Sequence, residues 1–128
     1  MEMLDLMKQR HSVRQYTDRP IEVEKRNALN GMIAQINQKA GLHIQPFYEE
    51  PQCFDSTMAH YGKFTGVKDY ISLVGKRSPK LEETLGYYGE QLGLKAQELG
   101  LNTCWVALTH GRSQAEIEKG EKEICLIS

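Results

Sequence analysis

Two arginines, a histidine and a serine lie within five residues near the N-terminus, in the run Arg10-His11-Ser12-Val13-Arg14. In extended backbone alternate side chains share a face, so Arg10, Ser12 and Arg14 would point the same way. Guanidinium groups bind phosphate through strong, directional hydrogen bonds, and a hydroxyl can add another. The run is typical either of a phosphate site or of a solvated basic turn between helices, and its local sequence alone favours the turn, because short motifs often match by chance.

Length and composition exclude several classes of protein. A chain of 128 residues predicts one domain. Its net charge of −1 argues against binding to nucleic acid, which usually needs a basic surface. No apolar run approaches the roughly 18 residues of a membrane span, and the N-terminus lacks the layout of a signal peptide. We therefore expect a cytoplasmic protein without a membrane partner.

The cysteines and histidines show no metal-binding pattern. Cys53, Cys104 and Cys125 are far apart, and the four histidines are scattered without the i, i+4 spacing of a helical metal site. The sequence predicts reduced thiols and no metal ligands.

Apolar spacing predicts two long helices. Residues 22–39 carry apolar side chains at helical spacing, and Gly41 follows as a left-handed cap. A second helix starts at Ser78-Pro79, with Ser78 as the cap, and runs to residue 99. Three glycines inside it, Gly86, Gly89 and Gly93, each cost about 1 kcal/mol relative to alanine. This cost indicates that another helix, a partner subunit or a flat ligand packs closely there.

The remaining elements predict an α+β fold. Strands are expected at residues 42–48, 70–74 and 122–128, with Pro46 restricting the first to a sheet edge, and residues 101–108 are expected to enter as a turn and continue as a strand. Residues 3–9 predict a short helix, and residues 49–66 predict mostly loop with one helical turn. The Ser113 and Glu116 spacing of a capping box predicts a further short helix ending at Gly120.

Two stretches resemble the FMN-dependent nitroreductase family. The first is the Arg-x-Ser-x-Arg pattern of residues 10–14, placed directly after a short helix. The second is residues 96–106, a helix end followed by Gly100-Leu101 and then Trp105-Val106. Their order and separation are similar to those of the subgroup that lacks iron–sulfur centres and includes NADH-dehydrogenase-like proteins. The resemblance extends over essentially the whole chain.

This resemblance implies a fold, a cofactor and a reaction. The fold would be a mixed sheet flanked by helices, completed in a homodimer with FMN at the interface. Hydride would pass from NADH or NADPH through the flavin to a nitroaromatic, quinone or similar acceptor, with the cofactor rather than a catalytic side chain carrying the chemistry. The residues matching the phosphate-binding positions are Arg10, His11, Ser12 and Arg14. Those matching the stretch whose backbone approaches the ring are Trp105, Val106, Ala107 and Leu108.

The chain departs from the family pattern in three places. Only Gln45-Pro46 and a following aromatic residue remain of a stretch that grips the flavin, and Ala107 or Leu108 replaces the usual glycine near the ring. The family also continues beyond the last strand, with a further basic phosphate contact and an arm that wraps the partner. We therefore expect residues 1–128 to form a single flavin-binding domain that lacks this extension.

Two other functions stay open at this point. The chain could bind FMN or another phosphate ligand without efficient turnover, or it could be a subunit that needs a second chain. Trp105 is typical of a core residue as well as of a cofactor contact, and Tyr87-Tyr88 is typical of core or dimer interface.

Overall fold

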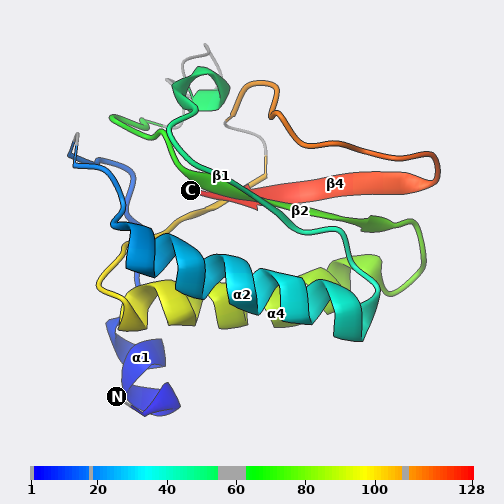
Figure 1. The fold of residues 1–128 in the computed structure, drawn as a ribbon, viewed down its shortest axis with the longest axis horizontal. Helices are drawn as coiled ribbons and strands as arrows, with labels where there is room; N and C mark the ends of the chain where they lie inside the picture. The colour runs from blue at the N-terminus through cyan, green and yellow to red at the C-terminus, as the bar shows by residue number, and fades with distance from the viewer. Residues whose placement is uncertain (1, 18, 55–62, 108–109) are drawn as a thin grey trace.

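The computed structural model describes residues 2–17, 19–54, 63–107 and 110–128, and its helices and strands confirm the α+β class (Figure 1). The elements in chain order are α1 (Met3–Gln9), α2 (Val23–Ala40), β1 (Gln45–Phe47), the 3-10 helix η1 (Pro51–Phe54), β2 (Tyr70–Lys76), α4 (Leu81–Glu98), β3 (Trp105–Val106) and β4 (Glu121–Ile127).

The four strands form one sheet in the order β1-β2-β4-β3, and each neighbouring pair is antiparallel. Within the described residues, the parallel component of the expected mixed sheet consists of two isolated bridges, Ser12–Thr103 and Gln15–Thr65. Pro46 lies in the edge strand β1 as predicted, because proline has no N–H to donate to a second neighbour. The described strand is shorter than the predicted span of residues 42–48.

Both faces of the sheet are buried, but by different structures. The long helices α2 and α4 lie side by side against one face, as Figure 1 shows. The core on that side comprises Ile33, Ile36, Ile44, Ile71, Leu73, Leu81, Leu85, Leu92 and Ile127. The core on the opposite side comprises Cys53, Phe54, Phe64, Val67, Tyr70, Cys104, Val106 and Leu126. There, η1 and connecting segments take the place of long helices in the described chain.

The helices predicted at residues 3–9 and 22–39 match α1 and α2 closely, and the second long helix differs from α4 at its start. Leu29, Ile33 and Ile36 are buried along α2, and Gly41 adopts a left-handed φ of 66° as predicted. The predicted cap at Ser78 is wrong, because α4 begins at Leu81 and Lys80 occupies the cap position. Ser78 instead takes part in a preceding turn, where its carbonyl accepts a hydrogen bond from the Leu81 N–H at 3.2 Å.

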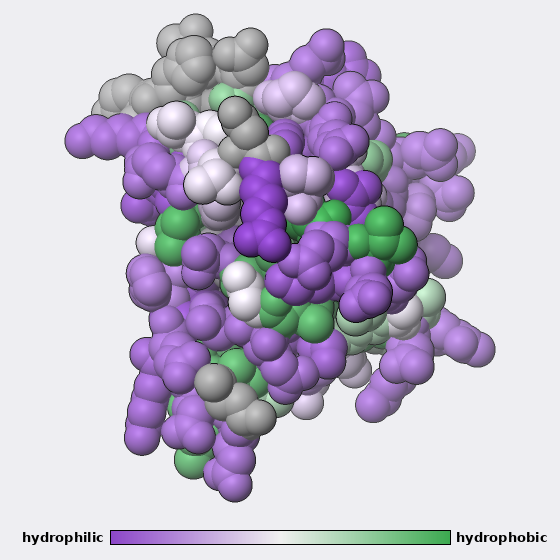
Figure 2. Space-filling view, turned by 60° about the vertical axis from the view of Figure 1, so that its left-hand side comes forward, coloured by the Kyte–Doolittle hydropathy of each residue, from purple (hydrophilic) through white to green (hydrophobic). Residues whose placement is uncertain are grey.

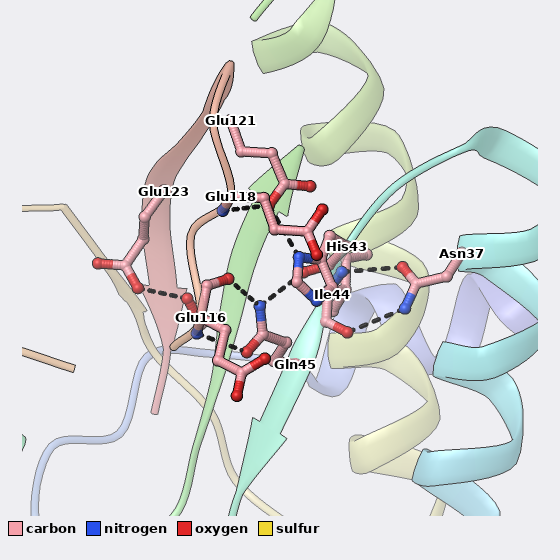
Figure 3. Close-up of polar contacts among 9 residues, drawn as sticks. Asn37, His43, Ile44, Gln45, Glu116, Glu118, Glu121 and Glu123 are labelled. Atoms are coloured by element: carbon pink, nitrogen blue, oxygen red, sulfur yellow. Dashed lines mark hydrogen bonds and ion pairs between the residues drawn. The ribbon is translucent and has the colours of Figure 1, made fainter. Parts of the chain in front are cut away.

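The short helix predicted after Ser113 is also wrong, because residues 113–119 are held in a non-helical conformation by side chains from the sheet (Figure 3). The Gln45 amide bonds the Glu116 backbone twice, donating to its carbonyl at 2.7 Å and accepting from its N–H at 2.9 Å. Ser113 Oγ donates to Glu123 at 2.5 Å rather than capping a helix. These contacts satisfy polar groups that a capping box would otherwise use.

Of the three glycines in α4, Gly89 is the one against which a neighbour packs most tightly. A Cβ at Gly89 would lie 2.6 Å from the Trp105 ring and 3.1 Å from a Leu73 methyl. At Gly86 no atom lies within 4 Å of such a Cβ. A close neighbour therefore exists at Gly89 and not at Gly86, but it is the Trp105 side chain of β3 rather than the helix, partner subunit or flat ligand that we expected.

These two glycines form a matched pair for a stability test. We expect Gly89→Ala to lower the free energy of unfolding by roughly 1–3 kcal/mol, because the methyl overpacks against Trp105. Gly86→Ala should raise it by about 0.5–1 kcal/mol, since the helix gains propensity without a clash. Urea unfolding followed by circular dichroism measures both. Stabilisation by both substitutions would contradict the packing described for Trp105.

A buried carboxylate joins the start of β4 to the segment before β1. His43 Nδ1 lies 2.9 Å from Glu121 Oε1, which also accepts the Glu118 N–H at 2.9 Å (Figure 3). The Glu121 side chain is 7% exposed. Burial acts to raise the pKa of Glu121, but its hydrogen bonds from His43 and the Glu118 amide outweigh that effect and lower it.

The lowered pKa of Glu121 predicts a pH-dependent contribution to stability. The stabilisation is fully present above the unfolded pKa, about 4.3, and is lost as the pH falls through the lower folded value. We expect Glu121→Gln to cost roughly 1–3 kcal/mol at neutral pH. Urea unfolding of both proteins should show this difference shrinking in acid, and a constant difference would mean that the charge of Glu121 contributes nothing.

Candidate functional site

The structure places the two sequence-predicted segments side by side. Ser12 forms a parallel bridge with Thr103, and the Val13 N–H donates to the Thr103 carbonyl at 3.0 Å. On the other side of the N-terminal segment, the Thr65 N–H donates to Arg14 O at 2.8 Å, and the Tyr16 N–H donates to Thr65 O at 2.8 Å. Residues 12–16 are therefore held extended between two distant parts of the chain.

A basic hollow of about 270 Å³ lies along this segment. Its lining residues are His11, Ser12, Val13, Arg14, Gln15 and Lys63. His11, Ser12, Arg14 and Lys63 are all exposed, so two cationic groups, an imidazole and a hydroxyl are accessible to a ligand. This donor set fits an oxyanion such as phosphate.

Lys63 is a cationic residue of this hollow that the sequence did not predict as a ligand. It precedes the Thr65 bridge, and its carbonyl accepts the Gln15 side-chain N–H at 2.8 Å. Its φ of 62° lies in the left-handed region. A lysine 48 residues from Gln15 carries no local signal, because only the pairing of the two segments brings it to the site.

Arg10, the first predicted phosphate ligand, lies apart from the hollow. Its Nε is 3.2 Å from Glu90 Oε1, and its Nη1 donates to Thr103 Oγ1 at 3.3 Å. The side chain is 18% exposed. Extended backbone at residues 12–14 does not align Arg10 with Ser12 and Arg14, because Arg10 still caps α1, with its N–H bonded to Leu6 O at 2.9 Å.

Trp105 and Val106 form β3, which is the edge strand next to β4. Cys104 and Ser128 exchange N–H to O bonds at 3.4 and 2.9 Å. In an antiparallel ladder the hydrogen-bonded residues alternate, so Val106 also faces β4 while the Trp105 N–H and carbonyl face away from it. Ala107 follows the end of β3 and is exposed, and the predicted contact at Leu108 lies outside the described residues.

The side chains of β3 are structural even though part of its backbone faces outward. Trp105 packs against the helix-side core and donates its Nε1–H to Glu90 Oε2 at 3.2 Å. Val106 is 2% exposed and packs in the opposite core. Any ligand at this edge would meet backbone groups before these two side chains.

A second depression, of about 250 Å³, lies between the start of α2 and the ends of α4 and β4. Its lining includes the apolar Leu29, Ile71 and Ile127. At its rim Glu22 pairs with Arg19 at 3.2 Å and with Lys25 at 3.4 Å. Figure 2 shows the side of the molecule where α1 and the start of α2 lie, with apolar patches between mostly hydrophilic residues. Because the cations Arg19 and Lys25 are already paired with Glu22, the hollow near Ser12 fits a phosphate better than this depression.

Cys53 and His110 resemble a nucleophilic pair but lack its chemistry. The Cys53 Sγ lies 3.9 Å from His110 Nδ1, and the thiol is fully buried. Burial raises the pKa of Cys53 to about 12, with nearby Glu50 and Glu123 adding to the effect. The thiol therefore stays protonated at neutral pH and is not a nucleophile.

No helix in the described part of the chain is long and apolar enough to cross a bilayer.

Comparison with known proteins shows where this fold occurs. The chain resembles an FMN-dependent nitroreductase from Clostridium difficile R20291 with a TM-score of 0.75 and 17% identity, covering 98% of this chain and 85% of that one. It resembles a nitroreductase with bound FMN from Bacteroides fragilis NCTC 9343 with a TM-score of 0.73 and 15% identity, covering 99% and 86%. The chain also resembles a "Putative NADH Oxidase" from Clostridium acetobutylicum with a TM-score of 0.73 and 20% identity, covering 97% of this chain and 85% of that one.

At these identities the structural likenesses show the shared fold. No curated protein sequence matches the chain. The family model described as "Putative TM nitroreductase" matches residues 2–128, which is nearly the entire sequence. The chain therefore belongs to this nitroreductase family.

Proposed function

We propose that this chain is an FMN-dependent oxidoreductase that passes hydride from NADH or NADPH to a nitroaromatic, quinone or similar acceptor. The observation that carries the proposal is the Ser12–Thr103 bridge, which puts a basic hollow next to an outward-facing strand edge. The family and the flavin-dependent proteins that share the fold support it.

The residues of the hollow suit the phosphate of FMN. The Arg14 guanidinium and the Lys63 ammonium supply two positive charges, and the Ser12 hydroxyl and His11 imidazole supply further polar groups. Charge-assisted hydrogen bonds to phosphate are about twice as strong as neutral ones. Arg10 can join them only if it leaves its present partners, Glu90 and Thr103.

The edge of β3 suits the polar rim of a flavin ring. When bound, FMN supplies the two-electron chemistry by accepting and returning hydride. The Trp105 N–H and carbonyl face away from β4, and the exposed Ala107 follows directly after the strand. These backbone groups would orient the ring without any side-chain acid or base, and the Val106 amide would not take part because it faces β4.

We further propose that the working form is a homodimer with FMN at its interface, each chain contributing the single domain of residues 1–128. The support is an apolar surface on α1, where Met3, Leu4 and Met7 are 51%, 66% and 54% exposed. In the same helix Leu6 is buried. A helix that is apolar on its outer side as well as its inner side is typical of an interface.

A second candidate is a protein that binds FMN or a phosphate ligand without efficient turnover. The position of Arg10 favours this alternative, because its pairing with Glu90 leaves the hollow with fewer cations than the family pattern implies.

The phosphate assignment predicts a difference between two flavins. Arg14→Ala should weaken FMN binding by roughly 1.5–3 kcal/mol, because one charge-assisted contact is lost, and Lys63→Ala should weaken it in the same direction. Binding of riboflavin, which lacks the phosphate, should change little. Quenching of flavin fluorescence measures both affinities.

Arg77→Ala is the matched control, since Arg77 is exposed and follows the far end of β2. It makes the same change in net charge without touching the hollow. Equal losses of affinity for FMN and riboflavin in Arg14→Ala would show that the phosphate does not bind in this hollow. An equal loss of FMN affinity in Arg77→Ala would show the same.

Turnover separates the enzyme from the binding protein. Protein loaded with FMN should oxidise NADH or NADPH in the presence of a quinone or nitroaromatic acceptor, with the parallel-line kinetics of a ping-pong reaction. Absorbance of the reduced nicotinamide follows the rate. If the chain binds FMN tightly but oxidises NADH or NADPH no faster than free FMN does, the result would support the binding protein instead.

A further inference from the structure

Glu90 connects the two segments that the proposed function assigns to FMN. One oxygen of its carboxylate pairs with Arg10 Nε at 3.2 Å, and the other accepts the Trp105 Nε1–H at 3.2 Å. Thr103, which precedes Trp105 by two residues in the chain, accepts a hydrogen bond from Arg10 Nη1 at 3.3 Å. We refer to Arg10, Glu90, Thr103 and Trp105 as the Glu90 cluster.

The cluster uses the part of Arg10 that would bind a phosphate. A guanidinium grips a carboxylate or a phosphate in a bidentate manner along one of two edges, Nε with Nη2 or Nη1 with Nη2. Here Glu90 engages Nε, on the first edge, and Thr103 engages Nη1, on the second. A phosphate therefore cannot take either edge with two hydrogen bonds while Arg10 keeps both partners, and at Nε its competitor is the Glu90 carboxylate.

Arg10 lies alongside α4 in this inward position. Its Cδ is 3.9 Å from the point where a Cβ at Gly93 would sit, which is an ordinary contact distance. The Glu90 side chain is 41% exposed, so its ion pair with Arg10 is not sealed from water. A pair of this kind is weak enough to be exchanged for a doubly charged ligand.

We propose that Glu90 acts as an internal substitute for the ligand phosphate, holding Arg10 until FMN draws it out to join Ser12 and Arg14. Glu90 is then a residue that sets affinity through Arg10, without touching the cofactor. The proposal rests on the proposed function, because that function assigns Arg10 to the phosphate.

Trp105 reports this exchange directly. It is the sole tryptophan of the chain, so intrinsic emission reads its surroundings alone. While Arg10 is bound, the charge of Glu90 beside the indole is neutralised. When phosphate withdraws Arg10, the indole N–H faces an unpaired carboxylate, and its emission should change.

The test compares Glu90→Gln with the native protein. Glutamine keeps an oxygen for the Trp105 N–H but no charge for Arg10, so FMN should bind roughly two- to fivefold more tightly. Glu98→Gln is the control, because Glu98 lies in the same helix, pairs with Lys95 at 2.8 Å and gives the same change in net charge. It should leave the affinity unchanged.

A double-mutant cycle isolates the pair. In an Arg10→Gln background, Glu90→Gln should no longer tighten FMN binding, because the contested donor is gone. Inorganic phosphate added to the native protein should shift the Trp105 emission, and the shift should be absent in Arg10→Gln. Circular dichroism checks that each variant is folded.

The outcomes separate this inference from the proposed function. Native FMN binding with an unchanged or weaker affinity in Glu90→Gln overturns the exchange and leaves the proposed function standing. Tightening of equal size in Glu98→Gln also overturns it, because the effect would then be one of net charge. Absence of FMN binding together with an Arg10-dependent emission shift in phosphate overturns the flavin assignment but supports the exchange.

Discussion

The pairing of residues 12–13 with Thr103 is the interaction on which the proposed site depends. One backbone hydrogen bond, from the Val13 N–H to Thr103 O, joins segments 90 residues apart in the chain. On its other side the same N-terminal segment pairs with Thr65, which brings Lys63 next to Ser12 and Arg14. Without these bridges the basic residues would lie on a loop that is not held next to Lys63 or β3.

The sheet makes this pairing possible because β3 lies at its edge. Cys104 and Val106 turn their backbone toward β4, so Thr103 and Trp105 turn theirs outward. Thr103 uses its outward carbonyl to hold the N-terminal segment, which leaves Trp105 as the outward position of β3. The half-buried Trp105 packs on one face of the sheet and the buried Val106 on the other, so the strand can present backbone at a fixed position.

Local sequence was sufficient for the elements whose signals are local. The stripe Leu29, Ile33, Ile36 and the cap at Gly41 predicted α2 to within one residue at each end. The helix expected after Ser113 failed because Gln45, distant in sequence, satisfies the Glu116 backbone. No pattern within residues 113–120 contains that information.

The candidate site shows the same division between local and distant information. The family resemblance named Ser12 and Arg14 as phosphate ligands, and the fold places both in one hollow. Lys63 could not be predicted, because it reaches the hollow only through strand pairing. The sequence pointed to Arg10 as a candidate ligand but could not predict its position. Its partner Glu90 comes from a helix whose orientation the sequence does not reveal.

A crystal structure of the chain grown with FMN would locate the cofactor. We expect the phosphate within hydrogen-bond distance of Ser12, Arg14 and Lys63, with the ring against the backbone of Trp105 and Ala107. FMN bound instead in the depression between α2, α4 and β4, with the hollow near Ser12 empty, would contradict this expectation.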